Sequence, residues 1–184
     1  MQPFIIFEGI ASSGKTTLEQ MLQEKLSDSM IISEEMTLML LINNIDPQEA
    51  VKHLSVVLDE IEEQPARAFI IDRFHLTHAF RTSVDLSSFD EIEKRIIDKY
   101  KPLIALLQIH EDAISSRIEE ASVLRGASWV KGKQGSLEEK IVYYKNQQRE
   151  LMKLIKQSNL PFVIIETSDK DWSRYIIEIQ NALK

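Results

Sequence analysis

The chain has 184 residues, of which 43% are hydrophobic and 28% are charged, and its formal net charge is −7. This length and composition predict one globular domain over residues 1–184 and exclude a disordered chain or a membrane-spanning one, since no apolar run approaches the ~18 residues that a bilayer requires. The acidic balance disfavours extended nucleic-acid contact, and the absence of cysteine excludes disulfides and thiolate sites. The start, MQPFIIFEG, lacks the features of a signal peptide, so a cytoplasmic location is expected.

Five short apolar runs follow one another along the chain, separated by segments long enough for helices. They read FIIFEG, MIISEE, AFIID, LIALLQI and FVIIET, and four of them follow closely on a proline. Continuous runs rich in Ile, Phe and Val are typical of strands buried on both faces of a parallel sheet. Between the second and third runs, Asp46-Pro47 followed by Glu49 predicts the start of a helix. The alternation predicts a three-layer α/β fold with a central five-stranded, mainly parallel sheet flanked by helices.

The first run leads into a phosphate-binding motif. In FEGIASSGKTTLEQ, the glycines, lysine and threonine have the spacing Gly-x4-Gly-Lys-Thr, after a predicted strand and at the start of a predicted helix. Backbone N–H groups and the helix dipole hold phosphate oxygens in such a loop, and the lysine adds a cation. The motif predicts that the chain binds a nucleoside triphosphate with Mg²⁺, the threonine hydroxyl being a metal ligand. The predicted nucleotide-binding residues are Gly9, Ser12, Ser13, Gly14, Lys15, Thr16 and Thr17, with Thr16 also on the metal.

Asp72 and Arg73 come directly after the third apolar run. Ligands bind beyond the carboxyl ends of parallel strands, so both residues are expected to border the same crevice as Lys15. Asp72 is predicted to orient Mg²⁺, the alternative being a helix cap. Arg73 is predicted to stabilise the transferred phosphoryl group or to hold an acceptor phosphate, the alternative being an ion pair with a nearby acid.

FEG-x4-GKTT, a strand ending in DRF, and an arginine-bearing helix before a basic glycine-containing loop resemble the thymidylate kinase and deoxynucleoside kinase families of P-loop kinases. The resemblance covers nearly the whole chain in order and spacing. It implies ATP- and Mg²⁺-dependent phosphoryl transfer to a nucleoside monophosphate or deoxynucleoside, with catalytic roles for Lys15 and Arg73. It also implies a lid at about residues 117–136, from which Arg117 and Arg125 act over the donor phosphates, and a possible homodimer.

The acceptor side departs from the thymidylate kinase pattern. Phe74 stands in place of a tyrosine, Ala11 in place of an acid that contacts the acceptor sugar, and Glu34 and Glu35 in place of an arginine that binds the acceptor phosphate. An acid there repels a monophosphate but suits a nucleoside, because a carboxylate can take the proton of an attacking 5′-hydroxyl. Glu34, Glu35, Arg73 and Phe74 are therefore predicted to bind the acceptor, with one of the two glutamates, Glu35 in the catalytic set, as the base; the alternative is a solvated acidic turn. The DRF segment argues against a nucleoside acceptor, since deoxynucleoside kinases carry Glu-Arg-Ser at this place.

Two further classes of function stay open. The acceptor of a kinase on this scaffold can be another small hydroxyl compound, and a P-loop ATPase or nucleotide-binding regulator needs no small acceptor. A guanine-reading NKxD motif is absent, which disfavours a GTPase. Of the two tryptophans, Trp129 lies in the predicted lid, where it is a candidate to cover a base, whereas Trp172 is expected to pack in the core.

Overall fold

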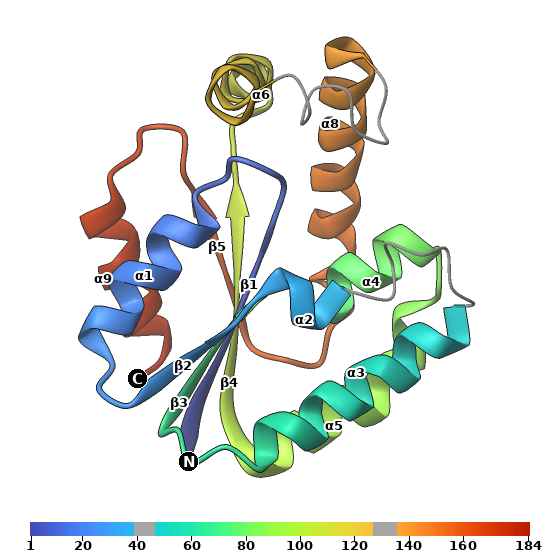
Figure 1. The fold of residues 1–184 in the computed structure, drawn as a ribbon, viewed down its shortest axis with the longest axis vertical. Coiled ribbons are helices and arrows are strands. Elements are labelled where there is room, and N and C mark those ends of the chain that lie inside the picture. The colour runs from blue at the N-terminus through green and yellow to red at the C-terminus, as the bar shows by residue number, and fades with distance from the viewer. Residues whose placement is uncertain (39–46, 127–135) are drawn as a thin grey trace.

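The computed structural model describes residues 1–38, 47–126 and 136–184. Its strands form one sheet in the order β2-β3-β1-β4-β5, and every neighbouring pair is parallel (Figure 1). The predicted five-stranded parallel sheet is confirmed. In chain order the strands are β1 (Gln2–Gly9), β2 (Ser29–Ile32), β3 (Ala68–Asp72), β4 (Tyr100–Gln108) and β5 (Phe162–Glu166).

Helices cover both faces of the sheet (Figure 1). One face carries α1 (Lys15–Lys25) and α9 (Trp172–Ala182); the other carries α3 (Pro47–Glu62), α4 (His75–Thr82), the 3-10 turn η2 (Leu86–Phe89) and α5 (Asp90–Lys99). The short α2 (Glu34–Leu38) follows β2, and α6 (Glu111–Arg125) and α8 (Leu137–Leu154) rise beyond the carboxyl ends of the strands. None of the helices described is long and apolar enough to cross a membrane.

The alternation of side chains along the strands divides the core into two layers. In β1, Ile5 and Phe7 face α1 and α9, whereas Phe4 and Ile6 face the other helical layer. All four side chains are fully buried, which explains why the run shows no polar alternation. A third apolar cluster joins α6 and α8 to the phosphate-binding loop, and its members are Ile10, Ala11, Ile109, Ile114, Ile118 and Tyr144.

The structure corrects the predicted end of the second run. MIISEE was expected to be extended, but β2 ends at Ile32 and Glu34 opens α2. The reason is that β3, the only described neighbour of β2, ends at Asp72, one residue beyond the last pair Ile32↔Ile71, so a longer β2 could gain at most one more paired residue. Two acids are also favourable in the first turn of a helix, where the dipole is positive. The helix expected after Asp46 does begin at Pro47, although Asp46 itself lies outside the described residues.

The first part of the predicted lid is helical. α6 runs from Glu111 to Arg125 and therefore contains both arginines assigned to the lid. Residues 127–135 of the predicted lid, including Trp129, lie outside the described part of the chain.

Candidate active site

The phosphate-binding loop joins β1 to α1 through backbone that only glycine adopts freely. Gly9 has φ 143° and Gly14 has φ 98°. A Cβ on Gly9 would lie 2.7 Å from the Leu107 carbonyl oxygen, and one on Gly14 would lie 2.4 Å from the indole ring of Trp172. Both glycines are thus required by conformation and by close contact, and the loop places the N-terminus of α1 at the carboxyl edge of the sheet.

Lys15 is curled back over this loop. Its Nζ lies 3.4 Å from the carbonyl oxygens of Gly9 and Ile10 and 4.0 Å from Asp72 Oδ1. Burial, together with the nearby Arg73, lowers the pKa of the Lys15 ammonium to about 8. These partners are weak ones, so the ammonium is free to exchange them for phosphate oxygens.

Arg73 is held in a strained turn directly after β3. Its φ is 62°, and its N–H donates to the Phe7 carbonyl at 2.9 Å. The buried carboxylate of Glu8 anchors the next turn by accepting from the Phe74 N–H at 2.8 Å and from the Thr77 N–H at 3.2 Å. The chain is thereby bent so that the Arg73 side chain turns toward the loop, and strain of this kind is common at functional sites.

The same bend sends Phe74 into the core. Its ring is fully buried, packs against Phe4 and His75, and is absent from the residues that line the cavity described below. The structure therefore does not bring Phe74 to the site, although the sequence predicted it as an acceptor-binding residue.

Glu34 joins the site from α2. Its carboxylate lies 3.2 Å from Arg73 Nε and 3.2 Å from a terminal nitrogen of Arg81 on α4. Burial alone would raise the pKa of Glu34, but Arg73, Lys15 and Arg81 hold it below the usual value of a glutamate. Glu35, the next residue, is exposed and does not line the cavity. The pair predicted from sequence is thus divided, with Glu34 at the site and Glu35 outside it.

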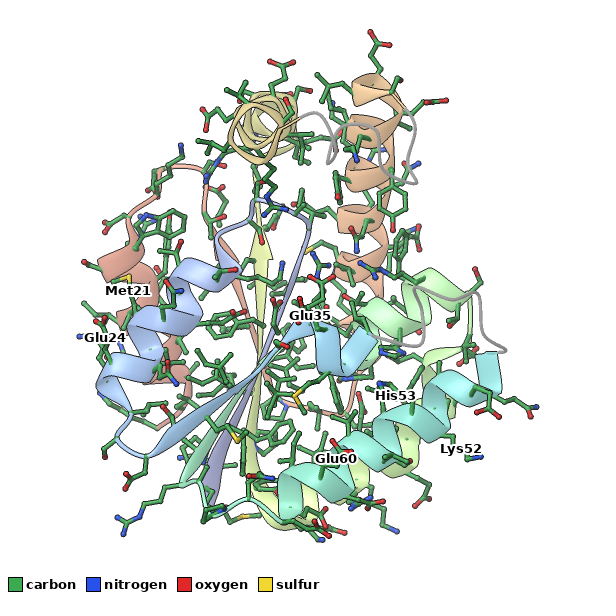
Figure 2. The ribbon with its side chains drawn as sticks, in the orientation of Figure 1. Met21, Glu24, Glu35, Lys52, His53 and Glu60 are labelled. Atoms are coloured by element: carbon green, nitrogen blue, oxygen red, sulfur yellow. The ribbon has the colours of Figure 1, made fainter. Side chains whose placement is uncertain are left out.

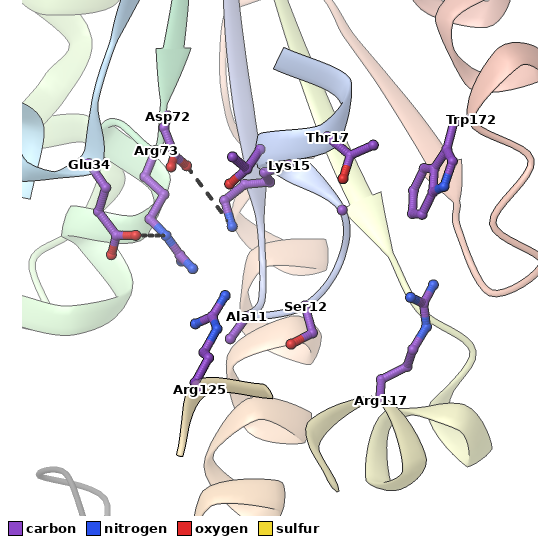
Figure 3. A pocket seen from close by; sticks show the side chains of 12 residues that line it. Ala11, Ser12, Lys15, Thr17, Glu34, Asp72, Arg73, Arg117, Arg125 and Trp172 are labelled. Atoms are coloured by element: carbon purple, nitrogen blue, oxygen red, sulfur yellow. Dashed lines mark ion pairs between the residues drawn. The ribbon is translucent and has the colours of Figure 1, made fainter. Parts of the chain in front are cut away.

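Lys15, Arg73 and Glu34 line one cavity of about 260 Å³ at the carboxyl edge of the sheet (Figure 3). Arg117 and Arg125 enter it from α6, opposite Lys15 and Arg73. Arg117 is oriented by a 2.6 Å hydrogen bond to the Thr167 carbonyl. Gly9 and Ser13 are buried and do not line the cavity. The lining residues are Ala11, Ser12, Gly14, Lys15, Thr16, Thr17, Glu34, Asp72, Arg73, Arg117, Arg125 and Trp172.

Several polar atoms around the cavity are buried without a hydrogen-bond partner among the described residues. They include Asp72 Oδ1, the hydroxyls of Ser12 and Ser13, and one terminal nitrogen of Arg73. Such orphaned groups are uncommon in folded proteins. Carboxylate and hydroxyl oxygens suit Mg²⁺, and guanidinium and N–H donors suit phosphate, so the residues present fit a metal–nucleotide complex.

Three residues near the site were missed from sequence. Arg81 carries no motif and reaches Glu34 only because α2 and α4 are neighbours in space. Trp172 was expected to pack, and it does contact the core, but its ring also lines the cavity over Gly14. Glu19 was not singled out from the sequence, yet the residue is only 3% exposed. Its position four residues after Lys15, one helical turn on, is the signal that could have drawn attention to it.

No protein-family model matches the chain, and no curated protein matches it in sequence. Solved structures do match it along nearly its full length. The YorR protein of Bacillus subtilis, in complex with phosphorylated GDP, superposes with a TM-score of 0.63 at 19% identity, over 96% of this chain and 95% of that one.

Two kinases of different acceptor type are equally similar in fold. Deoxyadenosine kinase from M. mycoides with bound dATP gives a TM-score of 0.58 at 18% identity, over 98% of both chains. Thymidylate kinase from Candida albicans gives 0.57 at 17% identity, over 100% of this chain and 94% of that one. The chain therefore has the fold of the P-loop nucleoside and nucleotide kinases.

Proposed function

We propose that the chain is a phosphotransferase that moves the γ-phosphoryl group of ATP to a nucleoside or a nucleoside monophosphate. The observation that carries this proposal is the convergence of Lys15, Arg73, Arg117 and Arg125 on one cavity beside the phosphate-binding loop. Phosphoryl transfer asks a protein mainly for positioning and for positive charge around the phosphoryl oxygens. Thr16 and Asp72 would hold the Mg²⁺ ion, which neutralises charge on the phosphates when bound.

A nucleoside is the acceptor that the site favours. Glu34 lines the cavity beside Arg73, where an acceptor phosphate would meet its negative charge. Its two arginine partners keep it ionised, so it can accept a hydrogen bond from an acceptor hydroxyl and take the proton as the new P–O bond forms. We assign this role to Glu34 rather than to Glu35, because the Glu35 side chain is exposed.

A nucleoside monophosphate is the second candidate acceptor. Arg73 and Arg81 both contact the single carboxylate of Glu34. An acceptor phosphate that displaced Glu34 would find both arginines in place.

The test measures ADP release from ATP and Mg²⁺, alone and with a panel of nucleosides and their monophosphates. We expect turnover with nucleosides, loss of turnover in Lys15→Ala, and a decrease of about 10²-fold in Glu34→Gln, the lower end of general-base contributions. Glu35→Gln discriminates between the two acids and is expected to keep most of the activity. Turnover that ignores every acceptor yet needs Lys15 would refute the kinase and favour an ATPase, and a monophosphate response unaffected by Glu34→Gln would refute the role of Glu34.

A further inference from the structure

Two histidines bind the end of α2, the short helix that brings Glu34 to the cavity. His53 of α3 places its Nε2 2.8 Å from the Met36 carbonyl oxygen, and His78 of α4 places its Nε2 2.7 Å from the Thr37 carbonyl oxygen. The two rings stack with their centroids 6.3 Å apart. A carbonyl oxygen only accepts, so each imidazole carries its proton on Nε2 and donates it.

These bonds fall on the last turn of α2 that the structure describes, since α2 is described over Glu34–Leu38. Most of the stability of a helix in a protein comes from its tertiary contacts, so these bonds help to fix the position of α2. The Thr37 hydroxyl adds a third bond, 3.1 Å from the Asp72 carbonyl oxygen, which ties α2 to the end of β3.

The opposite end of α2 is the functional end. Glu34 is its first residue, and the carboxylate contacts Arg73 and Arg81. Arg81 and His78 lie three residues apart on α4, so that one helix holds α2 at both ends. α4 is in turn anchored to β1, because its first turn donates to the carboxylate of Glu8.

We propose that His53 and His78 are positioning residues that clamp α2 against α3 and α4 and thereby fix Glu34 for contact with the acceptor. The inference rests on the proposed role of Glu34. His78 is fully buried, and burial lowers the pKa of its imidazole to about 4, so it stays neutral at physiological pH. His53 is half-buried and lies on the side of α3 nearest α2, whereas its neighbour Lys52 points away (Figure 2).

His53 is the residue to test, since its replacement does not open the core. We expect His53→Leu to lower kcat/KM for the acceptor roughly tenfold, well within the loss of about 10²-fold that a 1 Å misplacement can cause. KM for Mg·ATP should not change, because the phosphate-binding loop lies on another element. His53→Gln, which keeps an N–H donor at the same reach, should restore most of the loss, and Lys52→Leu is the matched control on the exposed side of α3.

A double-mutant cycle separates positioning from general damage. If His53 acts through Glu34, His53→Leu has no further effect in a Glu34→Gln background. An equal tenfold loss in that background, or no loss in the single variant, would overturn the proposal. Thermal midpoints of all variants identify any that fail to fold.

Amide hydrogen exchange tests the clamp without any need for activity. Exchange at Met36 and Thr37 is expected to quicken at least fivefold in His53→Leu and to stay unchanged in Lys52→Leu. Faster exchange in a protein that phosphorylates no acceptor would refute the proposed function and keep the clamp. Unchanged exchange in an active kinase would refute the clamp alone.

Discussion

Glu19 is a buried acid whose replacement should stabilise the protein in a pH-dependent way. It lies on α1, its side chain is 3% exposed, and its Oε1 has no hydrogen-bond partner among the described residues. Burial first, and the neighbouring Asp72 second, raise its pKa from 4.5 to about 7. That rise corresponds to about 3 kcal/mol against the charged form, because each tenfold change in an acid constant is worth about 1.4 kcal/mol.

The sign of the effect follows from proton binding in the two states. Below pH 4.5 the Glu19 carboxyl is protonated in both the folded and the unfolded chain, so its ionisation costs nothing. Between pH 4.5 and about 7 the unfolded chain releases this proton while the folded chain keeps it, so the free energy of unfolding falls as pH rises. Above pH 7 the full cost of about 3 kcal/mol is present.

Glu19→Gln keeps the shape of the side chain and removes the charge. We expect the variant to be more stable than the native protein by about 2 kcal/mol at pH 8. This gain is smaller than the cost of ionising Glu19, because the buried amide also needs hydrogen-bond partners. At pH 4 the two proteins should differ little in stability. Urea unfolding at both pH values measures the difference. Glu24→Gln, on the exposed face of the same helix (Figure 2), should change stability by less than about 0.5 kcal/mol. A less stable Glu19→Gln at pH 8, or the same gain at both pH values, would refute the reasoning.

Three further predictions concern the phosphate-binding loop. Because the pKa of Lys15 is about 8, raising the pH from 7 to 9 should weaken ATP binding about tenfold as the ammonium is lost, and calorimetry that finds a constant affinity would contradict this. Gly14→Ala should destabilise the protein by at least about 1 kcal/mol, because Gly14 has a left-handed backbone conformation. Part of the cost also comes from the 2.4 Å contact of the new Cβ with Trp172. Urea unfolding of the Gly14→Ala, Trp172→Ala double variant should therefore show that the contact cost is removed and the backbone cost is kept. Binding of ATP should change the fluorescence of Trp172, which lines the cavity, so a change that survives in Trp172→Phe must come from elsewhere.

The fold and the donor side of the site could be predicted because their determinants are local in sequence. Buried parallel strands are continuous apolar runs, and a phosphate-binding loop is one contiguous motif whose glycines are fixed by backbone geometry. Asp72 and Arg73 were placed correctly beside Lys15 for a related reason, since strand ends in a parallel sheet meet at one edge. The order of the strands was not predicted, because the apolar runs alone do not say which strands are neighbours.

The arrangement of the residues proposed to bind the acceptor could not be predicted, because it depends on contacts between distant segments. Nothing in MIISEE says that the strand stops at Ile32, since that boundary is set by where β3 ends. Glu34 and Glu35 are separated because both lie in α2, and successive side chains of a helix point in different directions. Their adjacency in the sequence does not show this. Phe74 was misplaced in a similar way: its position in the DRF segment suggested a ligand contact, but the φ of Arg73 and the bonds to Glu8 turn it inward.

The phosphate-binding loop and Glu34 are therefore held in place by different kinds of contact, and this difference bears on the choice of acceptor. The donor side is held by glycine conformation and by one sheet edge. Glu34, the acid proposed to contact the acceptor, instead lies on α2, which is bonded by side chains of α3 and α4. We expect changes at His53, His78 or Arg81 to shift Glu34 and to leave the phosphate-binding loop in place. If Glu34 contacts the acceptor as proposed, a scaffold built in this way allows the acceptor to change while the donor stays the same.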